Sequence, residues 1–285
     1  HDPQPIALVR KKAGNKWIWR CHIDVSSPRQ DVWKFLKDFI SQYDAAVFSA
    51  PMYSQSLPVR QFLIAPSIDP LSDKNKELSQ AEIAAVLEKY KIPDDKPILT
   101  QISRFDRLKD PLGVIEAYKK VKKYVDCRLI LAGGGATDDP EGVQVFEEVK
   151  NRAGSDRDIH ILLLPQNDIE VNALQRASTV IIQKSLKEGF GLTVSEALWK
   201  AKPVVASHVG GIPLQITNKY SGLLCHSIDG AAFAVKQLLN NPRYARKLGE
   251  NGREHVRNNF LVTRHLKDYM MLFLALYHSE DIIYL

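Results

Sequence analysis

The chain has 285 residues, of which 45% are hydrophobic and 25% are charged, and its formal net charge is +6 at pH 7. This composition is that of a soluble globular protein with one large domain or two ordinary ones, and it excludes disordered and fibrous chains. No apolar run is long enough to span a membrane. Lysine and arginine are spread over many predicted helices rather than gathered in one block, so the positive charge does not indicate a nucleic-acid partner.

The cysteines and histidines carry no sign of a disulfide or metal framework. Cys21, Cys127 and Cys225 are odd in number and far apart, so a reducing cytoplasm is the simplest compartment. The eight histidines show no paired metal-ligand spacing, and no metal is expected. No signal peptide is expected. The sequence starts at His1 inside what looks like structured sequence, so we expect a processed or incomplete chain.

The first third of the chain predicts short strands mixed with helices. In chain order these are a helix beginning near Pro5, a strand at 17–23, a helix from 26 to about 42, strands at 45–49 and 61–65, and a helix at 79–90. Four side chains of the second helix are expected to face the core: Val32, Phe35, Leu36 and Phe39. Ser79 can cap the last helix. The turn-rich region around 66–95 is the predicted domain junction.

From residue 97 onward strands and helices alternate regularly. The predicted strands are 98–103, 128–132, 161–164, 179–183 and 204–207, and the predicted helices are 111–124, 143–152, 168–176 and 192–200, with a helical tail at 231–240, 242–258 and 263–277. Val114, Tyr118 and Val121 recur at helical spacing and predict one buried stripe. Such alternation predicts an α/β fold with a parallel sheet covered on both faces, whose ligands bind at the carboxyl ends of the strands.

One stretch, 183–200, combines a strand end, a glycine turn and a helix start. The first N–H groups of a helix lack intrahelical partners and can bind an anion, and Gly189 and Gly191 allow the backbone to approach a ligand closely. Glu188 and Glu196 lie eight residues apart, and two carboxylates beside a phosphate-binding turn suit hydroxyl groups. This combination favours a nucleotide-sugar site. The alternative, that the glutamates only favour the helix dipole, stays open.

The loop at 103–110 also joins a predicted strand to a predicted helix. Arg104 can supply a forked donor and Lys109 a point charge, so both can converge on a diphosphate. Asp110 precedes Pro111 and fits a helix N-cap. A solvated, charged loop is the alternative.

Two further glycine turns follow predicted strands. The run Gly133 to Gly135 does not match the GxGxxG fingerprint of dinucleotide-binding proteins. Two roles remain open for it: a turn beside a ligand and a purely structural turn. The backbone amides of Gly210-Gly211 are expected to shape the sugar side of a cleft. From the residues alone, His1 and His22 are best explained as structural histidines at strand ends.

Together these stretches resemble the C-terminal half of retaining glycosyltransferases of the GT4 type, which have the GT-B fold. The resemblance covers roughly 95–280 and rests on the Glu188-x7-Glu196 spacing, the Ser-Arg-Phe-x3-Lys loop at 103–109 and the Gly-Gly-Ile-Pro turn. Three further stretches are similar to trehalose synthases and trehalose phosphorylases. They are the His-Asp-Pro-Gln-Pro start, Trp-Arg-Cys-His-Ile-Asp at 19–24, and Pro-Ser-Ile-Asp-Pro-Leu-Ser at 66–72.

The resemblance implies a set of site residues. The implied donor-binding set is Ser103, Arg104, Lys109, Gly189, Phe190, Gly191, Leu192, Thr193 and Glu196, and the implied catalytic pair is Glu188 and His1. In the family the cations hold the donor diphosphate, the first glutamate contacts the donor sugar, and the second holds the ribose. The histidine lies by the acceptor. Neither a metal nor another cofactor is implied. Where the family has Lys-Gly in the phosphate loop, this chain has Lys109-Asp110.

The resemblance also implies a domain plan: 1–66 as the end of an acceptor-side lobe, 67–260 as a complete Rossmann-like donor lobe, and 261–285 as a helix packing back toward the first lobe. The implied reaction moves glucose from a nucleotide diphosphate-glucose to glucose and makes trehalose. A trehalose phosphorylase, or a donor-binding module without catalysis, are the alternatives. No nucleic acid or membrane is expected as a partner, and apolar surface left by an incomplete first lobe predicts a homo-oligomer.

Overall fold

The structure is a computed structural model and describes residues 2–8, 14–134, 140–164 and 167–278. The first part contains a parallel sheet with strand order β1-β2-β3, made of β1 (Ile18–Arg20), β2 (Ala45–Phe48) and β3 (Arg60–Leu63). Three helical segments accompany this sheet: η1 (Gln4–Leu8), α1 (Gln30–Ile40) and η2 (Pro51–Tyr53). Where a helix was predicted to begin near Pro5, the described residues form the short 3-10 segment η1.

The core-facing side of α1 differs from the prediction. Of the four side chains predicted to face the core, Leu36 and Phe39 are partly buried, whereas Val32 and Phe35 are 45% and 56% exposed. Trp33 and Ile40 are buried instead, and Trp33 packs against Trp19 of β1 with the ring centroids 6.5 Å apart. The helix carries two overlapping apolar stripes, and burial of the large indole decides which one faces the sheet.

The second part contains a six-stranded parallel sheet with strand order β6-β5-β4-β7-β8-β9, and this confirms the predicted α/β class. Its strands are β4 (Ile98–Ile102), β5 (Arg128–Gly133), β6 (Ile159–Leu163), β7 (Val180–Gln183), β8 (Val204–Ser207) and β9 (Leu223–Cys225). The last strand was not predicted. The direction of strand addition reverses between β4 and β7, which creates the crevice where such sheets bind ligands.

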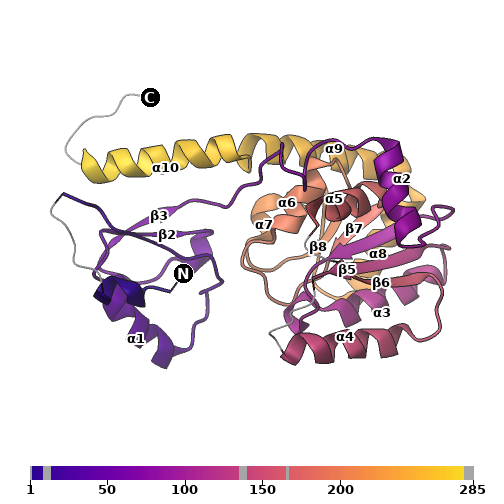
Figure 1. The fold of residues 1–285 in the computed structure, drawn as a ribbon, viewed down its shortest axis with the longest axis horizontal. Helices are drawn as coiled ribbons and strands as arrows, with labels where there is room; N and C mark the ends of the chain where they lie inside the picture. The colour runs from indigo at the N-terminus through magenta and orange to yellow at the C-terminus, as the bar shows by residue number, and fades with distance from the viewer. Residues whose placement is uncertain (1, 9–13, 135–139, 165–166, 279–285) are drawn as a thin grey trace.

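Helices cover both faces of this sheet (Figure 1). They are α2 (Gln80–Lys89), α3 (Pro111–Lys122), α4 (Pro140–Ala153), α5 (Asp168–Ala177), α6 (Leu192–Trp199), α7 (Ile212–Gln215), α8 (Ile228–Asn240) and α9 (Pro242–Asn259). Successive strand residues point to opposite faces: Leu129 and Leu131 pack with α3, α4 and α8, whereas Ile130 packs with α2 and α5. The predicted stripe of α3 is buried, and Ser79 forms a capping box with Glu82 at the start of α2.

The last helix, α10 (Val262–Tyr277), runs back over the three-stranded sheet (Figure 1). Leu272 and Leu276 pack with Ala45 and Val47 of β2, and the Arg60 guanidinium donates to the Ala275 carbonyl at 2.7 Å. The predicted domain boundaries and the predicted homo-oligomer stay predictions. Within the described ranges, no helix is both long and apolar enough to cross a lipid bilayer.

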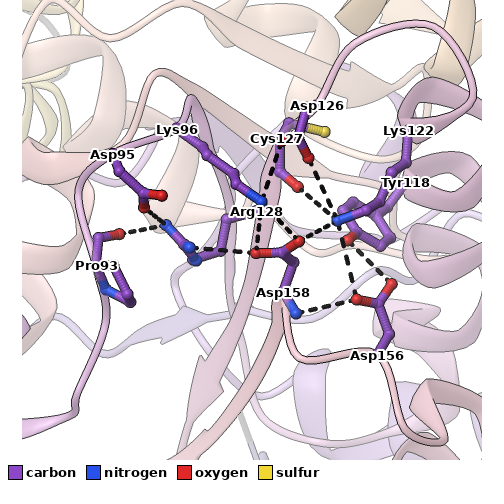
Figure 2. A network of polar contacts seen from close by, with 10 residues as sticks. All are labelled: Pro93, Asp95, Lys96, Tyr118, Lys122, Asp126, Cys127, Arg128, Asp156 and Asp158. Atoms are coloured by element: carbon purple, nitrogen blue, oxygen red, sulfur yellow. Dashed lines mark hydrogen bonds and ion pairs between the residues drawn. The ribbon is translucent and has the colours of Figure 1, made fainter.

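The amino edge of the second sheet is held by an ionic network (Figure 2). Asp158, just before β6, pairs with Lys122, with Arg128 at 3.2 Å and with Lys96 at 3.1 Å. Arg128 also pairs with Asp95 at 2.8 Å. The hydrogen bond from Lys122, aided by Lys96, lowers the pKa of Asp158 to about 2 although burial opposes this shift. The network joins the starts of β4, β5 and β6, at the opposite end of the strands from the ligand-binding edge.

Asp158→Asn is expected to lower the free energy of unfolding at neutral pH by roughly 2 kcal/mol, because the folded-state pKa lies well below the unfolded value. This contribution is present above the unfolded pKa and is lost as the pH falls through about 2, so the variant should also lose stability less steeply in acid. Urea unfolding between neutral and acid pH measures both effects. Asp126→Asn is the control, since Asp126 is 64% exposed and its ion pairs contribute little. Equal losses in both variants would contradict the prediction.

Candidate functional site

A cleft of about 740 Å³ lies at the carboxyl ends of β4 and β7 and extends to residues 22–24 of the first part. Ten of the eleven predicted site residues line it: Ser103, Arg104, Lys109, Glu188, Gly189, Phe190, Gly191, Leu192, Thr193 and Glu196. The eleventh, His1, lies outside the described residues. Two loops contribute the polar side chains. Lys109 of one loop pairs with Glu188 of the other, although the two residues are 79 positions apart in the sequence. The parallel sheet brings them together because it gathers all its strand ends at one edge.

The loop after β4 is shaped by its own side chains. Residues Arg107–Lys109 form a short 3-10 helix, η3, which Asp106 caps by accepting from the Lys109 backbone N–H at 3.1 Å. Gln101 donates to the Lys109 carbonyl at 2.7 Å. Arg104 pairs with Asp106 at 3.2 Å and its side chain is 67% exposed. The loop therefore fixes the backbone of Lys109 and leaves Arg104 at the mouth of the cleft.

Lys109 and Glu188 form a direct ion pair in the cleft. The Lys109 ammonium donates to Glu188 Oε2 at 2.6 Å, and the Ser185 hydroxyl donates to the same oxygen at 3.1 Å. Glu188 is 8% exposed. A charge-assisted hydrogen bond at this depth ties the two loops together. The residue predicted to hold phosphate and the one predicted to hold the sugar are thus adjacent.

Asp110 occupies a left-handed backbone conformation, with φ +49°. Glycine favours this region, and aspartate tolerates it better than most residues, which explains how Asp110 replaces the glycine of the family pattern. Its carboxylate accepts from the Gly113 N–H at 3.0 Å and from the Lys184 ammonium. The predicted N-cap is confirmed. The cap and the lysine together offset the negative charge that Asp110 adds near the cleft.

The glycine turn after β7 packs against the glycine turn after β8. A Cβ on Gly210, whose φ is +53°, would lie 1.6 Å from the Glu188 carbonyl oxygen, and the Gly211 N–H donates to the Gly189 carbonyl at 3.2 Å. Gly210 and Gly211 are not among the described residues that line the cleft. The expectation that their amides shape the sugar side was therefore wrong, because one amide is used in holding the Glu188 turn.

Two buried side chains fix the same turn from other directions. The Tyr53 hydroxyl of η2 lies 3.0 Å and 2.5 Å from the carbonyl oxygens of Glu188 and Gly189. Burial raises the pKa of Tyr53, so the phenol stays a donor. Gln215 donates to the Phe190 carbonyl and accepts from Ser195 at 2.5 Å. The first part of the chain therefore helps to build the turn that precedes α6.

Glu196 lies deeper, on the second turn of α6. Its side chain is only 5% exposed, and its Oε2 has no hydrogen-bond partner among the described residues. Burial raises the pKa of Glu196, while the charges of Lys74 and Lys200 oppose that rise. A buried carboxylate oxygen that lacks a protein donor and lines a cleft is suited to accept from a ligand hydroxyl.

Several cleft residues were not predicted, among them His22, Lys74 and Lys187. The sequence favoured a structural role for His22, but it lies on the wall facing the glycine turn, and burial lowers the pKa of its imidazole. Lys74 comes from the turn-rich segment before α2, where no pattern distinguishes one lysine from another.

Gly133 packs against the Ser103 carbonyl, so its role is structural, and Gly135 lies outside the described residues.

The residues described contain no group of three or more His, Cys, Asp or Glu side chains arranged to hold a metal ion. The expectation of a site that needs no metal or other cofactor stays a prediction.

Comparison with known families gives two matches. Residues 83–255 match the model described as glycosyl transferases group 1, and residues 1–55 match the one described as trehalose synthase, N-terminal domain. The chain belongs to the group 1 glycosyltransferase family. The predicted recognition of a glycosyltransferase is thereby confirmed.

Trehalose synthases are among its relatives. That of Rubrobacter xylanophilus is 48% identical over 97% of this chain and 68% of its own length, and that of Pyrococcus horikoshii is 45% identical over 95% and 66%. The trehalose phosphorylase of Pleurotus pulmonarius is 29% identical over 90% of this chain and 41% of its own length. The chain thus spans about two thirds of the length of these trehalose synthases.

Solved structures confirm the predicted GT-B fold. Sucrose-phosphate synthase of Thermosynechococcus elongatus has a TM-score of 0.76 at 22% identity, covering 93% of this chain and 69% of that one. The Anabaena protein HepE in complex with UDP-glucose has a TM-score of 0.77 at 16% identity, covering 91% and 72%.

Gly210→Ala is expected to destabilise the chain by about 1–3 kcal/mol, because the added Cβ would meet the Glu188 carbonyl at a backbone conformation that alanine disfavours. Thermal unfolding measures the loss. Gly134→Ala is the matched control, since a Cβ there meets no atom of the described residues within 4 Å. Wild-type stability in the Gly210 variant would show that the two glycine turns are not held in this contact.

Proposed function

We propose that the chain carries the donor site of a trehalose synthase, which transfers glucose from a nucleotide diphosphate-glucose to glucose with retention of configuration. One observation carries this proposal: the Lys109–Glu188 pair, the start of α6 and the partly unsatisfied carboxylate of Glu196 line a single cleft. Trehalose synthases at 45–48% identity support the choice of product.

The cleft offers each part of such a donor a suitable partner. Arg104, Lys109 and the first N–H groups of α6, at Leu192 and Thr193, would hold the diphosphate, because helix N-termini and cations both attract it. Glu188 would accept from the glucose hydroxyls. Glu196 would accept from the ribose hydroxyls.

The proposed chemistry is electrostatic. The bond from the glucose anomeric carbon to the diphosphate oxygen breaks, and cations and helix amides stabilise the negative charge that develops on the leaving group. The acceptor hydroxyl forms the new bond from the same face and gives its proton to the departing phosphate. The products are trehalose and a nucleoside diphosphate. His22 and Asp24 line the cleft opposite the glycine turn, where the acceptor would enter, and His1 stays a predicted neighbour.

Trehalose phosphorylase is the second candidate, since phosphorylases at 28–30% identity are also relatives. Inorganic phosphate would then replace the nucleotide. The buried acceptor oxygen of Glu196 favours the synthase, because a phosphorylase donor has no ribose for it to bind.

Calorimetric titration with UDP, ADP and GDP tests the donor site. We expect saturable binding of at least one nucleotide, and Glu196→Ala should weaken it by roughly 10- to 100-fold, the effect of losing a hydrogen bond to a charged group. Glu147→Ala is the control, because Glu147 is exposed on α4, where it pairs with Lys150. A folded wild-type chain that binds none of the three nucleotides would contradict the proposal.

Turnover is tested in a version extended to the length of the trehalose synthases. Lys109→Ala and Glu188→Ala should each lower kcat/KM by about 100-fold or more, because each removes a charged partner of the donor. Trehalose formation from nucleotide-glucose and glucose is the assay. Dependence on inorganic phosphate instead of a nucleotide sugar would establish the phosphorylase, and unchanged turnover in both variants would exclude this cleft.

A further inference from the structure

The segment before α2 presents one side chain to the cleft. Among residues 67–78, all of which the structure describes, Lys74 is the residue that lines the cleft. Residues 70–76 form turns and bends. The Lys74 side chain is 34% exposed, and its ammonium pairs at 3.2 Å with Asp168 at the start of α5. The pair lies at the surface of the cleft, where a ligand can reach it.

Polar side chains of α5 hold this segment by its backbone. Asn172, which is fully buried, donates to the carbonyl oxygens of Asp73 at 2.9 Å and Lys76 at 2.8 Å. Arg176 donates to the same Lys76 carbonyl at 2.9 Å. A buried amide donor costs free energy unless it is paired, so these bonds are expected to persist. They fix the carbonyls on both sides of Lys74, which is therefore presented from an anchored backbone.

The same segment is tied to the helix that carries Glu196. The Lys200 ammonium donates to Asn75 Oδ1 and to the Glu196 carbonyl, both at 3.1 Å. Asn75 follows Lys74 directly in the sequence, and Asn75 and Lys200 are 3% and 7% exposed. Lys74 and Glu196 both line the cleft. Lys74 therefore lies at the end of the cleft where Glu196 is proposed to bind the ribose.

An apolar wall lies beside Lys74. Ile102, the last residue of β4, and Val171 on α5 belong to the same apolar cluster, and both line the cleft. Val171 follows Asp168 by three residues, so it lies on the same face of α5 as the carboxylate that Lys74 contacts. An apolar wall with one polar group beside it suits a flat ring with polar edges. In a nucleotide the base follows the ribose, so the base is the group expected here.

We propose that Lys74 is a specificity-determining residue of the donor site: its ammonium leaves Asp168 and donates to a carbonyl oxygen of the nucleobase. An ammonium group only donates. Uracil and guanine present a carbonyl oxygen at the edge where adenine presents an amino group, so adenine would set a donor against a donor. Leaving Asp168 costs little, because both side chains are partly exposed. The inference rests on the proposed function and names the donor class: a uracil or guanine nucleotide sugar.

Calorimetric titration of Lys74→Met and the wild-type chain with UDP, GDP, ADP and pyrophosphate tests the inference. The wild type should bind UDP and GDP about tenfold more tightly than ADP, the effect of one hydrogen bond to a charged group. Lys74→Met should remove this preference by weakening UDP and GDP, and it should leave pyrophosphate unchanged, since pyrophosphate has no base. Uridine diphosphate that lacks the 2′ and 3′ hydroxyls should be weakened by the same factor as UDP, because the contact does not pass through Glu196.

Lys76→Met is the matched control. Lys76 belongs to the same segment, but its side chain pairs with Asp73 at 2.6 Å and is not among the described residues that line the cleft. All four affinities should therefore match the wild type. Lys74→Gln is a second variant: its amide both donates and accepts, so it should bind the three nucleotides with similar affinity.

Several outcomes would overturn the inference. An equal loss for UDP and pyrophosphate would assign Lys74 to the diphosphate, and a loss confined to nucleotides with ribose hydroxyls would assign it to the ribose. Unchanged affinities in Lys74→Met, or tightest binding of ADP by the wild type, would also contradict it while leaving the proposed function in place. A wild-type chain that binds pyrophosphate but none of the three nucleotides would overturn the proposed function and this inference together.

Discussion

The structure of the site depends on one close backbone contact, that between the turn at Glu188-Gly189 and the turn at Gly210-Gly211. The contact leaves no room for a Cβ on Gly210. It fixes where the Glu188 side chain leaves the backbone and where α6 begins. Tyr53 binds the same turn from the first part of the chain, so the three-stranded sheet and the six-stranded sheet meet at the residues proposed to bind the donor. A few backbone atoms therefore position the whole cleft.

The charges around the cleft follow a common arrangement. Two carboxylates near the predicted anion site each pair with a lysine: Glu188 pairs with Lys109, and Asp110 pairs with Lys184. For Glu196, the charges of Lys74 and Lys200 oppose the rise in pKa that burial causes. Because lysines lie close to these acidic groups, the site can carry carboxylates for hydroxyl recognition while it still attracts a diphosphate.

Stability and ligand binding are placed at opposite ends of the strands. The ionic network centred on Asp158 joins the amino ends of β4, β5 and β6, where no described residue lines the cleft. The carboxyl ends carry the glycine turns and the buried Glu196. A parallel sheet allows this separation because all its strands point the same way, so each edge gathers one kind of loop. Changes in the network are therefore expected to alter unfolding without altering the cleft.

The sequence by itself determined the α/β class and most helices and strands, because hydrophobic period, caps and glycine turns are local signals. The ten predicted residues that line the cleft came from the glycine turns and charged loop together with the resemblance to a glycosyltransferase family. The tertiary structure decided what depends on pairing between distant segments. It chose Trp33 over Phe35 as the buried side of α1, turned Gly210 and Gly211 toward the Glu188 turn, and brought His22 to the cleft wall. It also placed Asn75 against Lys200 across 125 residues. Local patterns could not give these contacts, since each is fixed by packing and charge between parts of the chain that only the folded sheet brings together.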